Sequence, residues 1–212
     1  EEVIEAPNTS VATINSSFEI DPEDIDIPRI NVTQKMSDSD APTGSVVYDK
    51  KYWIAEAETP LKVIAVAAQK GWREDIPFDD EDIPRIAWSR EQANSIEADS
   101  AYDMTEFAEI TLLIQQPEDC HEDAAGALQI PLGAHSYALG KINVAKNAYR
   151  STFKRLATFA ALNAGVPLHT KVWSFTSEVI TRGKYTWFTP SLTVTKAEPD
   201  ADVAAFVANF TG

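Results

Sequence analysis

The stretch from Lys171 to Lys196, KVWSFTSEVITRGKYTWFTPSLTVTK, decides how the rest of the sequence is interpreted. β-branched and aromatic residues alternate along it, and the alternation breaks at residues 181–183, which predicts a β-hairpin. Large aromatic and basic residues gather here, and Glu178 is the only acid between them. The aromatic residues are Trp173, Phe175, Tyr185, Trp187 and Phe188, and the basic ones are Lys171, Arg182, Lys184, Lys196 and, just upstream, Arg155.

The length of the hairpin loop decides which aromatic side chains share a face. A three-residue loop, favoured by a glycine at its third position, puts Trp173, Phe175, Tyr185 and Trp187 on one face. A two-residue loop instead buries Trp173 and Phe175 together with Phe188 and leaves Tyr185 and Trp187 on the opposite face. The arginine of the turn is a poor residue for a positive φ, so we expect the three-residue loop.

Charge is distributed unevenly along the 212 residues, whose net charge is −15. Residues 1–123 hold 29 acids and 9 bases, residues 124–196 hold one acid and 9 bases, and residues 197–212 hold 3 acids and no base. Salt screens charges more than about 10 Å apart at 0.1 M, so the local sign of charge governs the docking of a polyanion. The single cysteine excludes an internal disulfide framework. No apolar run approaches the roughly 18 residues of a membrane span.

Short strand patterns separated by polar turns predict a β-rich α+β fold. The continuous apolar run Leu61 to Ala68 is typical of a buried strand, and Glu106 to Gln115 is a second long strand pattern. Residues 75–82 form an acidic loop, and Ser89 begins a polar stretch that indicates irregular structure or a short helix. Shorter strand patterns lie at residues 26–32, 46–48, 51–54 and 127–132. We expect a β-barrel with an associated helix.

The main helix is predicted from about residue 142 to residue 164. Apolar residues recur there at helical spacing, and Gly165 followed by Pro167 supplies a stop. A basic stripe follows this helix at positions i, i+4 and i+8, formed by Lys146, Arg150 and Lys154.

These patterns divide the chain into three parts. Residues 1–25 are polar and acidic, which predicts a flexible arm. Residues 26–196 are expected to form one antiparallel β-barrel domain with long acidic loops. Residues 197–212 form an acidic C-terminal tail.

Catalytic motifs are absent from the sequence, which has no Gly-rich phosphate loop and no Gly-x-Ser-x-Gly, His-Glu-x-x-His or Cys-x-x-Cys pattern. Residues 119–123, DCHED, include metal-ligand types, but consecutive side chains cannot all point at one ion, and a solvated acidic loop explains them. Residues 79–82 lack the alternate spacing and the glycine of a calcium loop. We therefore expect no enzyme activity, no metal and no cofactor.

Single-stranded nucleic acid is bound by a positive groove along its phosphates and by aromatic rings that stack on its bases. The hairpin offers both kinds of group in Lys171, Trp173, Phe175, Arg182, Lys184, Tyr185 and Trp187, and the predicted helix adds Lys146, Arg150 and Lys154. In the alternative, the rings are core and the bases neutralise the acidic half inside the molecule, with acidic loops covering the groove. Tyr185 and Trp187, beside Lys184, fit a binding site better, whereas Trp173 and Phe175 fit the core at least as well.

Scattered segments covering about half of the chain carry a family resemblance. They are Ile27-Pro28-Arg29-Ile30 with Gln34 and Ser37, Gly44-Ser45-Val46, Pro167-Leu168 before Trp173 and Phe175, and Gly183, Tyr185 and Trp187 leading to Pro190. The sequence in these segments resembles phage-encoded single-stranded DNA-binding proteins of the OB-fold type. The resemblance implies an OB-like five-stranded barrel with elaborated loops. Such proteins often recruit partners through an acidic tail with a terminal aromatic residue, which Asp200, Asp202 and Phe210 match in part.

The leading hypothesis is a sequence-tolerant single-stranded DNA-binding protein that acts in phage replication or recombination in the host cytoplasm. Its expected partners are single-stranded DNA and replication or recombination proteins, with no membrane, and a homo-oligomer fits this hypothesis. The main alternative is a phage structural or assembly protein whose acidic half contacts a basic partner. A third hypothesis is an acidic DNA mimic that uses residues 75–82 to inhibit another protein.

Overall fold

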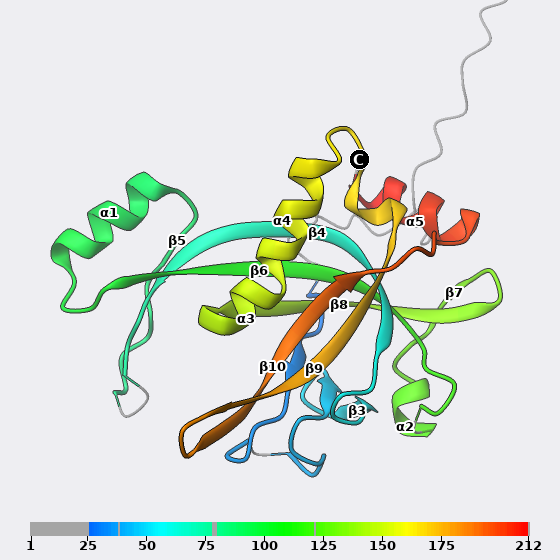
Figure 1. Cartoon of the computed structure of the whole chain (residues 1–212), viewed down its shortest axis with the longest axis horizontal. Coiled ribbons are helices and arrows are strands. Elements are labelled where there is room, and N and C mark those ends of the chain that lie inside the picture. The colour runs from blue at the N-terminus through cyan, green and yellow to red at the C-terminus, as the bar shows by residue number, and fades with distance from the viewer. Residues whose placement is uncertain (1–25, 38, 78–79, 121, 212) are drawn as a thin grey trace, which may run out of the picture.

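The computed structural model describes residues 26–37, 39–77, 80–120 and 122–211, without the side chains of Glu122 and Thr211 (Figure 1). The arm predicted over residues 1–25 lies outside the described residues. The larger of two antiparallel sheets has the strand order β10-β9-β4-β6-β8-β7, with β5 paired to β4, and the smaller has the order β1-β2-β3. The strands are β1 (Ile30–Val32), β2 (Val46–Tyr48), β3 (Tyr52–Ala55), β4 (Leu61–Glu74), β5 (Ile86–Ala87), β6 (Met104–Gln115), β7 (Ile130–Leu132), β8 (His135–Ala145), β9 (Val172–Arg182) and β10 (Tyr185–Val194).

The long strands β4 and β6 form the centre of the larger sheet, which curls into a half-barrel (Figure 1). Both predicted strands are confirmed, but β4 continues past Ala68 to Glu74 because β6 pairs with it from Val63 to Glu74. A register shift between Ala65 and Ala67 bends the pair locally. The fold is thus β-rich and α+β, as expected. The larger sheet has seven strands, whereas the resemblance implies five.

One face of the larger sheet, here called the inner face, holds the main hydrophobic core. Val63 of β4, Ile110 of β6 and Leu192 of β10 are buried on this face. The smaller sheet packs against the same core through Ile30 and Val46. The helices α3 and α4, described below, close this core from the side of β10 (Figure 1).

The predicted helix over residues 142–164 is shorter than expected and broken. Ile142 and Val144 are buried and alternate with less buried neighbours, so this segment is the end of β8 and not a helix. The helix proper consists of α3 (Lys146–Ser151) and α4 (Phe153–Leu162). They separate at Thr152, whose backbone (φ −121°, ψ −81°) is not helical.

The expectation of one main helix is wrong, because α1 (Arg90–Asp99) and α5 (Ala201–Thr211) are as long as α4. The side chain of Ser89 accepts a hydrogen bond from the backbone N–H of Gln92, which confirms the start of α1. Shorter pieces are α2 (Glu122–Ala125) and the 3₁₀ turn η2 (Leu168–Thr170). None of the described helices is long and apolar enough to cross a membrane.

The C-terminal segment predicted as an acidic tail contains α5, which packs on the outer face of the larger sheet. Val203 and Val207, one helical turn apart, are buried against Ile64, Val66 and Leu113. The apolar i, i+4 pair therefore explains why this segment folds back onto the sheet.

Candidate nucleic-acid interface

The β9–β10 hairpin closes through a two-residue loop, so the expected three-residue loop is wrong. Tyr185 lies opposite Arg182, which leaves Gly183 and Lys184 as the loop. Gly183 has a φ of +60°, and a glycine at the first loop position is the pattern of a type II′ turn. The glycine takes the positive φ itself, so Arg182 remains in the strand and needs none.

This closure places Trp173 and Phe175 on the inner face, where each is only 1% exposed. The indole Nε1–H of Trp173 donates to the backbone oxygen of Leu168 at 3.2 Å, and its ring meets Phe159 edge-on with centroids 5.3 Å apart. Both aromatic rings are core residues. They are not accessible for stacking on a base, although the sequence offered them as site residues.

Tyr185 and Trp187 lie on the opposite face, near the end of the hairpin. The side chain of Tyr185 is 65% exposed, and the ammonium of Lys184 lies 5.3 Å from its ring centroid. Arg182 is the cross-strand neighbour of Tyr185 on the same face. A shallow hollow is lined by residues 182, 183 and 185–187. We call Arg182, Lys184, Tyr185 and Trp187 the tip cluster.

Charge at the tip cluster is dominated by its two cations. Neither Arg182 nor Lys184 forms an ion pair with another described residue. Glu178 faces the same side of β9 and is the only acid in the hairpin. The tip cluster therefore joins two unneutralised cations to two partly exposed rings.

Gln34 and Gly44, which are among the residues that carry the family resemblance, anchor the hairpin at Phe188. The amide of Gln34 pairs with both backbone groups of Phe188, accepting from its N–H at 3.0 Å and donating to its oxygen at 2.8 Å. The backbone N–H of Gln34 in turn donates to the hydroxyl of Ser37 at 2.7 Å. Gly44 lies against the ring of Phe188 so closely that a Cβ there would be 2.6 Å from it. This bracing fixes the hairpin at Phe188, and the tip cluster lies between that position and the end of the hairpin.

The predicted basic stripe on the helix is divided by the fold. Lys146 forms an ion pair with Asp75 at 2.7 Å, so its charge is neutralised locally. Arg150 and Lys154 are exposed and form no ion pair with a described residue. The hydroxyl of Ser151 donates to the backbone oxygen of Pro190 at 2.6 Å, which places Arg150 beside the strand that carries Trp187.

Lys171 lies away from the other predicted residues. It precedes β9 at the end opposite the tip cluster and forms an ion pair with Glu198 at 2.5 Å. Its role in this structure is to join the start of β9 to the segment before α5.

A second group of aromatic and basic side chains lies near α3, and the sequence interpretation missed it. The ring of Trp72 has the ammonium of Lys70 at 4.8 Å and the guanidinium of Arg90 at 5.8 Å from its centroid. On α3, the ring of Tyr149 stacks on Phe153 at 5.0 Å. Lys70 and Trp72 fall in the acidic first 123 residues and beyond the predicted end of the strand at Ala68, which hid them. Because β4 continues to Glu74, their i, i+2 spacing places them on one face.

Glu106 lies among the cations of this second group. It accepts a hydrogen bond from Lys70 at 2.5 Å, which lowers the pKa of its carboxyl group. The nearby charges of Lys154 and Arg90 lower this pKa further. All three basic side chains, Lys70, Lys154 and Arg90, therefore lower the pKa of the Glu106 carboxyl group.

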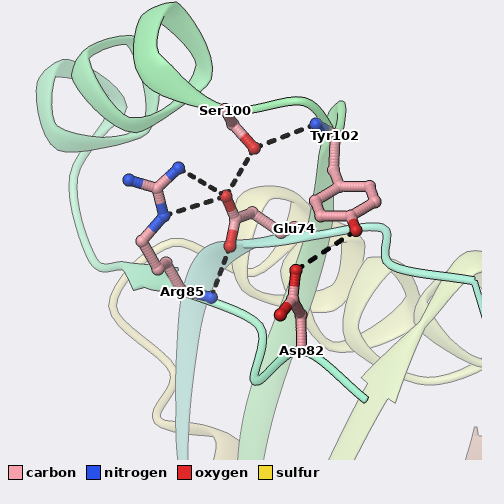
Figure 2. A network of polar contacts seen from close by, with 5 residues as sticks. All are labelled: Glu74, Asp82, Arg85, Ser100 and Tyr102. Atoms are coloured by element: carbon pink, nitrogen blue, oxygen red, sulfur yellow. Dashed lines mark hydrogen bonds and ion pairs between the residues drawn. The ribbon is translucent and has the colours of Figure 1, made fainter. Parts of the chain in front are cut away.

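The acidic loop after β4 is held by its own polar network (Figure 2). The buried carboxylate of Glu74 accepts hydrogen bonds from the backbone N–H of Arg85 at 2.8 Å, from its side chain at 2.9 Å and from the hydroxyl of Ser100 at 2.5 Å. These contacts hold the pKa of Glu74 at about 2. The hydroxyl of Tyr102 donates to the carboxylates of Asp80 and Asp82. Residues 78 and 79 of this loop lie outside the described residues.

No cluster of three or more metal-ligating side chains occurs within the described ranges. Of the sequence DCHED at 119–123, the described Cys120 is half-buried, and burial raises the pKa of its thiol. His121 lies outside the described residues.

The structure brings together four of the predicted residues at the tip and two on the neighbouring helices, and it separates the others. No protein-family model, curated protein or solved structure matches this chain. Its function is therefore inferred from the geometry and chemistry of the described residues.

Proposed function

We propose that this protein binds single-stranded DNA with little sequence preference and acts in phage replication or recombination. The observation that carries the proposal is the tip cluster, in which the exposed ring of Tyr185 lies beside two cations without acidic partners among the described residues. Stacked bases contribute about 1–3 kcal/mol each, and every base has a ring face, so such a site tolerates any sequence.

The roles of the side chains follow from their chemistry. Tyr185 and Trp187 stack on bases, and Arg182 and Lys184 bind the flanking phosphates. Arg150 and Lys154 add unpaired positive charge on the helices α3 and α4, which contact β10. These interactions require neither a metal nor a cofactor.

Further parts of the proposal rest on the resemblance and on the curled sheet. We treat the half-barrel as an elaborated OB-like fold, although its sheet has seven strands. Replication or recombination proteins in the host cytoplasm would be the partners, recruited through α5, where the exposed ring of Phe210 stacks at 6.3 Å on the partly buried ring of Phe206. A homo-oligomer is compatible with this arrangement.

A fluorescence titration with oligo-dT tests the proposal. Tryptophan emission is expected to be quenched at low ionic strength and to recover as salt is added. Lys184→Gln should weaken binding, because it removes a phosphate contact. Lys51→Gln is the matched control, because the ammonium of Lys51 also lies over a tyrosine ring, 4.8 Å from the centroid of Tyr52, but in the turn between β2 and β3 of the smaller sheet. Absence of salt-sensitive quenching in the unmodified protein would refute the proposal.

One observation favours the assembly alternative as a second candidate. A cleft of about 530 Å³ lies between the smaller sheet and the end of β6, and its wall combines Trp53 and Pro117 with the acids Glu56, Glu118 and Asp119. A basic, partly apolar segment of another protein would fit this chemistry. This alternative predicts a stable complex whose affinity does not change in Trp187→Ala or Lys184→Ala.

A further inference from the structure

The second aromatic and basic group defines a surface of its own, here called the arm cluster: Lys70, Trp72 and Arg90. It lies where β4 and α1 meet, toward the end of the molecule that carries α1 (Figure 1). Lys70 is already paired with Glu106, whereas Arg90 forms no ion pair with a described residue. The buried Nε1–H of Trp72 has no hydrogen-bond partner among the described residues.

The position of Arg90 is not explained by the stability of its helix. It is the first residue of α1, directly after the cap Ser89. A cation at a helix N-terminus is opposed by the helix dipole, which favours negative charge there. The structure nevertheless directs this guanidinium over the ring of Trp72. A positive charge that costs the helix some stability is expected to serve another purpose.

The helix α3 connects the arm cluster with the hairpin. On one side, Ser151 bonds to Pro190 of β10, and on the other, Lys146 pairs with Asp75 just after β4. Between these two anchors, α3 exposes Arg150. Lys154 follows at the start of α4, where its ammonium lies 6.0 Å from the ring centroid of Tyr149 on α3 and its charge lowers the pKa of Glu106, the partner of Lys70. Cations without an ion pair to a described residue thus occur in the tip cluster, on α3 and α4, and in the arm cluster; they are Arg182, Lys184, Arg150, Lys154 and Arg90.

We propose that a bound single strand does not end at the hairpin but crosses α3 and α4 to the arm cluster, where Arg90 binds a phosphate. This inference rests on the proposed function and extends its site to residues that lie more than 90 positions away in the sequence. Trp72 orients the guanidinium of Arg90, and Lys154 contacts the phosphate backbone between the two clusters.

The salt dependence of binding tests this path, because each lost phosphate contact lowers the slope of log K against log salt by about 0.7 for single strands. The probes are dT4 and dT16, which bracket the site sizes of OB-type binders. We expect Arg90→Gln to lower the slope by about 0.7 and the affinity severalfold with dT16 and to change neither with dT4. Arg90→Lys should restore the slope, since it keeps the charge. Lys62→Gln is the control, an exposed lysine near the other end of the same strand.

The outcomes separate the inference from the proposed function. If Arg90→Gln binds dT16 with an unchanged salt slope while Lys184→Gln lowers that slope, the hairpin site stands and the path to the arm cluster is refuted. If the unmodified protein binds neither oligonucleotide, the proposed function fails, and the inference fails with it. An equal loss with dT4 and dT16 would also refute the path, because dT4 is too short to span both clusters. Lys154→Gln is the second variant and should show the same length dependence.

Discussion

Trp173 and Trp187 lie in one hairpin and differ in exposure because side chains alternate along a strand. Trp187 pairs with Ile180 across the hairpin, whereas Trp173 pairs with Val194 on the inner face. A loop longer by one residue would reverse the faces of one strand relative to the other. Gly183, with its positive φ, therefore sets which rings the hairpin exposes.

Gly44 offers a residue-scale test of the brace that positions the hairpin. Gly44→Ala is expected to lower the free energy of unfolding, because its φ is +87° and its new Cβ would lie 2.6 Å from the ring of Phe188. Gly165→Ala is the matched control, with a φ of +84° and no atom within 4 Å. Left-handed backbone costs both variants about 1–2 kcal/mol. Urea denaturation should show a clearly larger loss for Gly44→Ala, and equal losses would contradict the close packing at Phe188.

Glu74 gives a pH-dependent prediction. Its pKa is about 2 in the folded protein and 4.5 in the absence of its partners, so its contribution to stability is complete above pH 4.5 and is lost as the pH falls toward 2. Glu74→Gln should therefore lower the melting temperature at pH 7, and the gap to the unmodified protein should narrow between pH 4.5 and pH 2. Thermal melts followed by circular dichroism measure this gap. The control is Glu97→Gln, at an exposed position of α1, which should change the melting temperature at pH 7 little. A gap for Glu74→Gln that does not change with pH would contradict the role of the network.

At the scale of elements, α5 is a structural part of the domain. Val207 is 0% exposed against the outer face of the sheet, so Val207→Asp should lower the free energy of unfolding by about 3 kcal/mol or more. Ala205→Asp, on the exposed side of the same helix, should cost less than about 1 kcal/mol. Denaturant titrations of both variants test this difference. Equal stability of the two would mean that α5 does not hold the outer face.

Elements with strong local signals were predictable from the sequence. The apolar runs of β4 and β6, the cap at Ser89 and the existence of the hairpin needed only neighbouring residues. The end of β4 at Glu74 did not follow from local pattern, because pairing with β6 extends it through polar residues. The segment from Ile142 to Ala145 was predicted to begin the helix, but pairing with β6 makes it the end of β8.

The candidate site was predictable only in part, for a related reason. The tip cluster consists of neighbours in the sequence, so composition revealed it. The arm cluster joins Trp72 to Arg90 and lies near Lys154 only because strands and helices fold together. The three-residue loop was expected because a two-residue loop was thought to need a positive φ at Arg182. In the structure the two-residue loop is Gly183 and Lys184, so the glycine takes the positive φ.

At the scale of the whole molecule, ion pairs neutralise some of the basic residues and leave others unpaired. Lys70, Lys146 and Lys171 each pair with an acid, whereas five other basic residues on the proposed path form no ion pair with a described residue: Arg90, Arg150, Lys154, Arg182 and Lys184. The protein can therefore carry a net charge of −15 and still present a positive surface within the screening length of a bound strand.

Release of Lys146 from its ion pair should strengthen DNA binding. Asp75→Asn removes the acid that pairs with Lys146 at 2.7 Å beside α3. We expect the affinity for dT16 at 50 mM salt to rise by up to about fivefold, the range that an exposed ion pair spans. Glu109→Gln is the control, because it releases Lys141, which lies on β8 outside the proposed path. Equal effects of the two variants in an anisotropy titration would contradict a local electrostatic role.

The most direct measurement uses the five tryptophans as built-in probes of the binding surface. Their indole N–H signals, assigned by Trp→Phe substitution, are followed by NMR as dT16 is added. The signal of Trp187 should shift most, and that of Trp72 should shift if the bound DNA reaches the arm cluster. The signals of the buried Trp173 and of Trp53 should stay in place. A titration in which the signal of Trp187 does not move would contradict the hairpin as the DNA-binding surface.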